Sequence, residues 1–194
     1  MSREEQKQQT RERIVQAAMR GFRRGGFGGL GVDGLAKEAG VTSGAFYVHF
    51  SSKSEAFGAA VAQGLAELRD GVLACQAQHG KAWWPEFVRF YLGFKRTCDL
   101  SDSCGLQSLS PEVARADDGA RLAFEAGLRE VARAILQGPR SAGAPRDEDA
   151  ALAALATLVG GVTMARAVAS PKLSQGIANA VGRQLLGERW TDGD

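Results

Sequence analysis

Histidine and cysteine are scarce in this sequence of 194 residues, which has 2 histidines and 3 cysteines. An odd, small number of cysteines does not indicate a disulfide framework. Neither His49 nor His79 belongs to a recognisable Cys/His or Ser/His/Asp grouping, so no catalytic or metal-binding arrangement is visible. We therefore expect no enzyme activity, no metal and no cofactor. The alternative functions for the protein are those of a thiol-dependent enzyme and of a helical adaptor protein.

Long hydrophobic runs are also missing. The longest weakly charged run, Ala150 to Ala165, has 16 residues, which is short for a membrane span. The N-terminal stretch "MSREEQKQQTRERIV" is too polar for a secretory signal. With 44% hydrophobic and 24% charged residues, the composition is that of a soluble globular protein able to bury a core without disulfides. We expect a cytoplasmic protein.

Charge is distributed unevenly along the chain. The net charge is +2, but residues 1–53 carry nine Lys/Arg and five Asp/Glu, and residues 54–194 carry 15 and 17. An N-terminal segment more basic than the rest favours a polyanionic partner. Random scatter of charge is the alternative interpretation.

Strand-like alternation is nearly absent, whereas helical periodicity dominates, so the sequence predicts an all-α fold. In the N-terminal part we expect a helix over residues 4–24, with Ile14, Val15, Ala18 and Phe22 on its apolar face. The glycines of "GGFGG" (residues 25–29) are expected to end it. Two short helices follow over residues 32–39 and 43–50, and then a long one over 53–78.

The rest of the chain also reads as helices. Pro111 suits the first position of a helix capped by Ser110, and Ser170 with Pro171 suits the start of another. The segment "QGPRSAGAPRDED" predicts a surface loop. The helices expected in this part cover residues 83–98, 106–110, 111 onward, 117–136, 146–169 and 171–186.

The first three predicted helices are joined by tight turns, and Val41 lies between the two short ones. This arrangement is typical of a helix-turn-helix, whose second helix enters the major groove of DNA. We expect a DNA-binding domain over residues 1–53 and a second, larger helical domain over residues 54–194.

The stretch "LAKEAGVTSGAFYVHFSSKSEAF" resembles the N-terminal DNA-binding domain of TetR/AcrR-type transcriptional repressors. The resemblance spans residues 10 to 57, about a quarter of the chain. Its motif is a helix ending in Ala-Gly-Val, followed by Ser/Thr, small residues, Tyr-x-His-Phe and Lys. The matching residues are Ala39, Gly40, Val41, Thr42, Gly44, Tyr47, His49, Phe50 and Lys53.

Each residue type in this stretch suits contact with DNA. Thr42 and Ser43 lie at a helix N-terminus, which favours phosphate. Gly44 and Ala45 allow close approach of the backbone, and the Ala45 methyl suits a thymine methyl. The side chains suited to phosphate are those of Tyr47, His49 and Lys53, although Tyr47 and His49 would equally serve as core residues with satisfied polar tips. Phe46 and Phe50, four residues apart, are expected to point inward.

Two features depart from the family pattern. Gly31 stands where the second helix usually has a Ser or Thr N-cap, and Gly34 lies inside that helix, so we expect it to be soft. The third helix has no Arg, Asn or Gln for bidentate base contacts. Specificity is therefore expected to rest on apolar contacts, on Lys37 and on DNA shape.

The resemblance implies a ligand pocket and a dimer interface in the C-terminal part. The helices over 146–169 and 171–186 would form a four-helix homodimer interface; packing within one chain is the alternative for the small residues of the first. The pocket is expected among aromatic and apolar residues, for each of which a plain core role is the alternative. These are Trp83, Trp84, Phe87, Phe90, Tyr91, Phe94, Phe124 and Met164.

The cysteines Cys98 and Cys104 flank "DLSDS". Three roles are open for these cysteines: inert thiols, a redox or electrophile sensor, or part of a metal site. The metal site has weak support, because no histidine lies nearby in the sequence. Cys104 is the sensor candidate, since a helix start lowers a thiol pKa. Together these features predict a homodimeric repressor that binds a palindromic DNA operator and is released by a small molecule or an electrophile.

Overall fold

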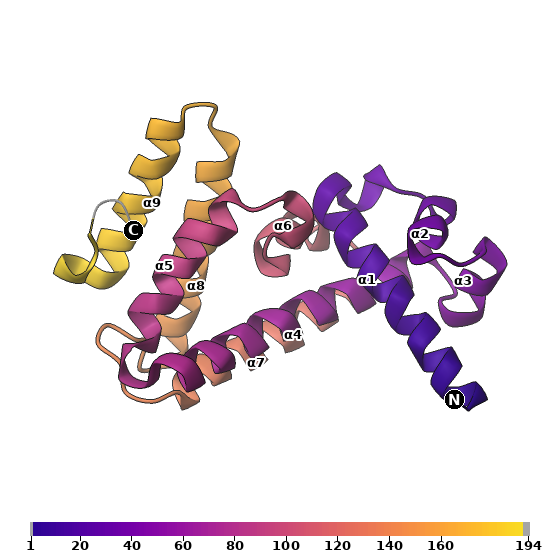
Figure 1. Ribbon diagram of the computed structural model, residues 1–194, viewed down its shortest axis with the longest axis horizontal. Coiled ribbons are helices and arrows are strands. Elements are labelled where there is room, and N and C mark those ends of the chain that lie inside the picture. Colours follow the sequence, from indigo (N-terminus) through magenta and orange to yellow (C-terminus); the bar gives the residue numbers. More distant parts are fainter. Residues whose placement is uncertain (1, 192–194) are drawn as a thin grey trace. The chain divides into compact units, whose positions relative to one another are not determined.

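The computed structural model describes residues 2–191, and every regular element in that part of the chain is a helix (Figure 1). The predicted all-α fold is therefore confirmed. In chain order the α-helices are α1 (Arg3–Gly29), α2 (Val32–Ala39), α3 (Ser43–His49), α4 (Lys53–His79), α5 (Trp83–Thr97), α6 (Gly105–Val113), α7 (Asp118–Gln137), α8 (Glu148–Ala167) and α9 (Pro171–Leu186). The 3₁₀ turns are η1 (Gly80–Ala82), η2 (Leu100–Asp102) and η3 (Gly187–Arg189).

These helices form two compact units. The first contains the chain up to Leu65 together with Leu100–Gly127, and the second contains Ala66–Asp99 together with the chain from Leu128 onward. The first unit therefore extends past residue 53, because α6 and η2 pack against α1. The helices α4 and α7 each contribute residues to both units. The functional division at residue 53 stays a prediction.

Helix α1 begins at a capping box, in which the Ser2 hydroxyl accepts from the Glu5 amide and the Glu5 carboxylate accepts from the Ser2 amide. Its predicted apolar face is buried, with Ile14 and Phe22 at 0% and 1% exposure. The predicted break of this helix within the glycines of residues 25–29 is confirmed at Gly26. The backbone leaves the helical region at Gly26, with φ +66°, but helical turns resume up to Gly29. Glycine adopts this φ without steric cost, so the first helix breaks at Gly26 and a short second helical segment follows it.

Helices α2 and α3 lie close to their predicted ranges, with α3 ending one residue early at His49. Gly40 ends α2 in the left-handed region at φ +66°, and its amide donates to α2 carbonyls. The Gly34 position makes room for a neighbour, since a Cβ there would lie 2.8 Å from Cγ of Leu30. Leu30 thus packs over a helix that has the weak Gly31 N-cap.

Helix α6 differs from expectation. The prediction of one piece ending at Ser110 and another starting at Pro111 was wrong, because α6 is continuous with Pro111 inside it. The Ser110 hydroxyl donates to the Leu106 carbonyl and caps nothing. Proline removes only one backbone donor here, and the amide of Ala114 donates to the Ser110 carbonyl, so the last turn is retained.

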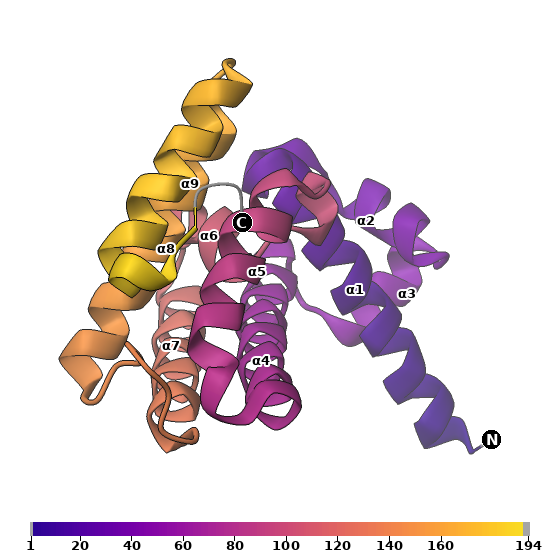
Figure 2. The same ribbon diagram turned by 60° about the vertical axis from the view of Figure 1, so that its left-hand side comes forward.

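In the second unit, α8 packs against both α5 and α9, and Figures 1 and 2 both show α8 and α9 side by side. Helix α8 starts at Glu148 and not at Arg146, because the Asp147 carboxylate caps it by accepting from the Ala150 amide at 2.8 Å. Gly161 lets α9 approach closely, since a Cβ there would lie 2.7 Å from Val181. Within the described residues, α8 alone is long and apolar enough to cross a membrane by length and composition; a packed helix of a soluble domain passes the same test.

Candidate nucleic-acid interface

Helix α3 has an inner and an outer face. Phe46 and Phe50 are buried at 0% and 1% exposure, and their ring centroids lie 5.7 Å apart, so their inward orientation is confirmed. On the outer face Tyr47 and Val48 are 56% and 69% exposed. Core packing therefore does not describe Tyr47. Its ring stands nearly perpendicular to that of Phe46, with the ring centroids 5.6 Å apart.

The start of α3 is held by two side-chain hydrogen bonds. The Thr42 hydroxyl accepts from the Ala45 amide at 3.1 Å, so Thr42 is the N-cap. The Ser43 hydroxyl donates to the Asp33 carboxylate of α2 at 2.6 Å. In the protein alone both hydroxyls thus stabilise the helix pair. Asp33 also places a negative charge beside the helix that is expected to approach phosphates.

Gly44 is exposed, and a Cβ added to it would meet only the Thr42 hydroxyl at 3.8 Å. The fold of the protein alone therefore does not need glycine at this position. Ala45, one residue further, is half-buried.

Basic residues of α1 lie beside the end of α3. The Arg11 guanidinium stands 4.9 Å from the Phe50 ring centroid, in cation–π geometry. Burial, followed by the positive charges of Lys7 and Arg11, lowers the pKa of His49 below its ordinary value. Two cations therefore face His49 from another helix, and this part of the surface is more basic than α3 alone.

Two further lysines were predicted to contact DNA. Lys53, at the first position of α4, has its ammonium 4.5 Å above the Phe27 ring. Phe27 in turn packs on Phe22 and Phe57, so the lysine stands on a fixed aromatic platform. Lys37 is exposed in the last turn of α2.

Sequence reasoning missed Lys7, Arg11 and Val48. The i, i+4 spacing of Lys7 and Arg11, which puts them on one helix face, was the available signal for the first two. Their electrostatic effect on His49 arises from tertiary structure and has no local signature in the sequence. An apolar residue such as Val48, between Tyr47 and His49, is expected in the core from sequence alone. In the structure it is the most exposed large apolar side chain among the described residues.

The predicted pocket residues occupy different environments. Trp83, Trp84, Phe87 and Tyr91 are buried in the second unit and contact one another ring to ring. Phe90 and Phe94 form a stacked, half-exposed pair on α5, and Met164 is 61% exposed on α8.

Phe124 belongs to the first unit and lines a shallow hollow with Val113 and Leu122, whereas Trp83 lines another hollow in the second unit. The single pocket containing all eight residues stays a prediction.

The cysteines are all free thiols. Cys104 is 5% exposed at the start of α6, and Cys98 is half-buried at the end of α5. The Cys98 sulfur lies 3.8 Å from Nη1 of Arg166, whose guanidinium also donates to the carbonyls of Lys95 and Cys98. Burial raises the pKa of Cys75, and nearby Glu86 adds to this. Among residues 2–191 no three His, Cys, Asp or Glu side chains gather as a metal site would need.

Helices α2 and α3, joined at a tight turn, form a helix-turn-helix unit with an exposed face on α3 and basic side chains around it. Residues 14–60 match the family model of bacterial regulatory proteins, tetR family. This segment of the chain is therefore similar to the DNA-binding domain of the TetR family.

Solved structures share the fold over nearly the whole chain. A TetR-family regulator from Agrobacterium tumefaciens has 20% sequence identity and a TM-score of 0.70, with 93% of this chain and 100% of that chain covered. NemR of E. coli in its reduced form has 20% identity and a TM-score of 0.69, covering 89% and 94%. The multidrug binding protein EbrR, complexed with imidazole, has 21% identity and a TM-score of 0.64, covering 90% and 94%. No curated protein matches the chain.

Proposed function

We propose that this chain is a homodimeric transcriptional repressor whose hold on a palindromic operator is released by a small molecule. The observation that carries the DNA-binding part is the outer face of α3, where exposed Gly44, Tyr47 and Val48 are flanked by basic groups from α1 and α4. Phosphate contacts would come from Tyr47, His49, Lys53 and Lys37, and base contacts from Ala45 and the backbone at Thr42, Ser43 and Gly44.

Lys7 and Arg11 extend this surface. Both are exposed on α1 and both act electrostatically on His49, so a phosphate bound at His49 lies within their field. Ser43 would exchange its bond to Asp33 for one to phosphate. The Asp33 carboxylate would then lose its hydrogen bond from Ser43 and lie near the negatively charged phosphate backbone of the DNA. The resulting repulsion would limit non-specific affinity for DNA.

The dimer interface is proposed on α8 and α9. The exposed positions of α8 between Ala153 and Ala167 are all uncharged, and Leu173, Gly176 and Ala180 continue an exposed uncharged face on α9. An extended face of small and apolar side chains is stable in water when another copy covers it. In a two-fold dimer the two α3 helices would reach half-sites about 34–36 Å apart.

Ligand response is proposed by way of α4, which is one continuous helix with residues in both compact units. A ligand that binds the second unit and displaces this helix would move Lys53 at its start. Such a ligand releases DNA only if it binds the two helix positions with different affinity. EbrR, with its bound imidazole, is a relative in fold whose structure holds a small molecule. The action is expected in the cytoplasm.

The function is tested by footprinting DNA upstream of the protein's own coding region with purified protein. We expect a protected site with two-fold symmetry. The Lys53→Ala variant should bind more weakly at every sequence and reduce the salt slope of log K by about one. The proposal fails if no protected site is found, and Lys53 is not a phosphate contact if affinity and slope stay unchanged.

A further inference from the structure

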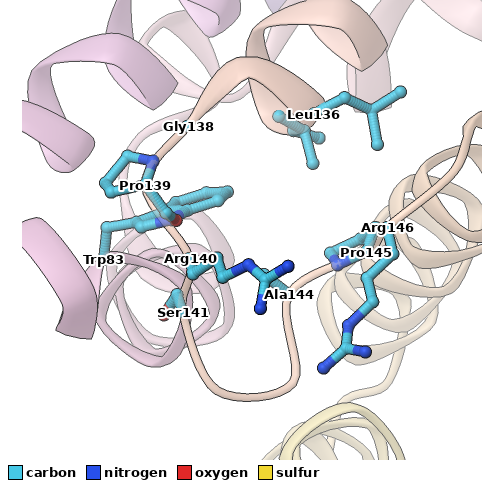
Figure 3. Close-up of a pocket in the computed structure, with 10 residues that line it drawn as sticks. Trp83, Leu136, Gly138, Pro139, Arg140, Ser141, Ala144, Pro145 and Arg146 are labelled. Carbon is cyan, nitrogen blue, oxygen red and sulfur yellow. The ribbon is translucent and has the colours of Figure 1, made fainter.

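The loop between α7 and α8, residues 138–147, encloses a hollow of about 250 Å³. Apolar walls come from Trp83, Leu136, Pro139, Ala144 and Pro145. Figure 3 shows Trp83 and Pro139 on one side, Pro145 on the other and Leu136 above, with the Arg140 side chain reaching between them. This volume lies below that of drug-sized ligand pockets, so the hollow suits a small ligand.

The loop is held in place by buried groups beneath it. The indole N–H of Trp83 donates to the Pro139 carbonyl at 2.9 Å, and the amide of Trp84 donates to the Ser141 hydroxyl at 3.2 Å. Buried Gln76 donates to the Ala134 carbonyl at the end of α7 and lies against Gly138, where a Cβ would come within 2.3 Å of it. These anchors shape the hollow before any ligand arrives, which lowers the cost of binding.

Two arginines, Arg140 and Arg146, line the hollow, and neither makes a hydrogen bond or ion pair within residues 2–191. The acidic residues that follow do not line it. Asp147 caps α8 through its bond to the Ala150 amide, and Glu148 pairs with Arg129 at 3.6 Å. Asp149 is exposed on α8. The hollow therefore combines two unsatisfied guanidinium groups with apolar walls.

We propose that this hollow is a binding site for a small organic carboxylate with a compact apolar body. The guanidinium groups of Arg140 and Arg146 would take the carboxylate, for which their planar donor pairs are matched, while the body would lie among Leu136, Pro139 and Pro145. The site lies apart from the DNA-binding surface in sequence and goes beyond the function proposed above. It stands or falls on direct ligand binding, whatever the outcome of DNA-binding experiments.

The test is isothermal titration of the full chain with benzoate, benzyl alcohol and inorganic phosphate. We expect saturable binding of benzoate, with a Kd of about 0.1–1 mM, and at least tenfold weaker binding of the alcohol and of phosphate. Arg140→Gln and Arg146→Gln should each weaken benzoate binding about tenfold. Both side chains are exposed and unpaired, so these variants are expected to fold.

The matched control is Arg133→Gln. Arg133 is an exposed arginine of α7 that lies about one helical turn before Leu136 and does not line the hollow. This variant should change benzoate affinity by less than about twofold, because dissolved salt screens the attraction between an exposed charge outside the hollow and the bound carboxylate. Absence of saturable benzoate binding overturns the site. Equal losses in all three variants would mean general electrostatic attraction, and benzyl alcohol or phosphate binding as tightly as benzoate would overturn the carboxylate assignment.

Discussion

The guanidinium of Arg13 on α1 donates a hydrogen bond of 2.8 Å to the carbonyl of Gly40, the residue that ends α2 in the left-handed region. The same side chain donates twice to the neighbouring Ala39 carbonyl, at 3.1 and 2.7 Å. One arginine thus caps the C-terminus of α2 from another helix. Since α3 starts within three residues of Gly40, Arg13 sets the position of the whole helix pair on α1.

Arg13→Ala should therefore lower the free energy of unfolding by about 1 kcal/mol and weaken DNA binding. Arg13→Lys should recover only part of the loss, because an ammonium lacks the planar fork that reaches both carbonyls. Thermal denaturation and gel-shift titration measure the two effects. Arg20→Ala, on the same helix and 3.8 Å from Glu38, is the control and should change little. Equal effects of the two alanine variants would contradict this role for Arg13.

Gly44→Ala separates folding from DNA contact. The added methyl meets nothing closer than 3.8 Å in the protein alone, so we expect stability to rise by about 0.5–1 kcal/mol from helix propensity. DNA affinity should fall, because the methyl would stand between the α3 backbone and the groove. Gly71→Ala, at an exposed glycine of α4 with open space around it, should show the gain in stability without the loss of affinity. Unchanged DNA binding by Gly44→Ala would exclude close backbone approach at this position.

His49 should make DNA binding depend on pH. Burial and the charges of Lys7 and Arg11 place its pKa below the ordinary 6.5, so the free protein holds it neutral at pH 7. A DNA phosphate beside it would raise that pKa, and binding would take up a proton. Affinity should therefore increase as the pH falls through the window between the bound and free pKa values. In the protein without DNA the sign is opposite, since protonation below 6.5 is favoured in the unfolded chain and lowers stability.

Titrations of operator DNA at about pH 6 and pH 8 test this dependence. His49→Gln should remove most of it, whereas His79→Gln, at the other histidine, should leave it intact. The same pH dependence in wild type and His49→Gln would mean that His49 does not contact phosphate.

Gly160→Glu tests the proposed dimer interface. A side chain at this exposed position of α8 meets nothing within 4 Å in one chain, so the protomer should fold. A charge buried in the α8–α9 interface would instead separate the subunits, and light scattering should report a monomer. Gly71→Glu adds the same charge on α4 and should leave the dimer intact. A dimeric Gly160→Glu protein would move the interface elsewhere.

Treatment with N-ethylmaleimide tests the thiols, because it forms a carbon–sulfur bond and transfers the thiol proton to the maleimide carbon. Cys98 is half-buried beside the Arg166 guanidinium, whereas Cys104 is 5% exposed, so mass spectrometry should find Cys98 modified first. If the thiol is a sensor, Cys98→Ser should protect operator binding from release. Faster modification of Cys104, with protection by Cys104→Ser, would restore the sensor role to the residue at the helix start.

Local sequence signals determined most of the secondary structure. Helix α2 begins and ends as predicted because Gly40 supplies a left-handed C-cap, and Ser170 with Pro171 starts α9 because a hydroxyl cap and a fixed φ act on their own neighbours. The motif from Ala39 to Lys53 likewise predicted the similarity to the TetR-family DNA-binding domain that the family model finds over residues 14–60. The predicted helix start at Pro111 was wrong. Proline favours the first turn of a helix when only its neighbours along the chain are considered, whereas the packing of α6 on α1 keeps the helix continuous through Pro111.

Tertiary structure alone decided which side chains act together. The contacts of Arg13 with Gly40 and of Lys53 with Phe27 join residues 27 and 26 positions apart, and no local pattern encodes them. Nor does any such pattern encode the electrostatic effect of Lys7 and Arg11 on His49. The same holds for Arg140 and Arg146, which the sequence presents as charges in a surface loop. Trp83 and Gln76, from the earlier helices, shape that loop into a hollow. Periodicity and capping specify helices through neighbours along the chain, whereas a binding site depends on the distances between helices that only packing sets.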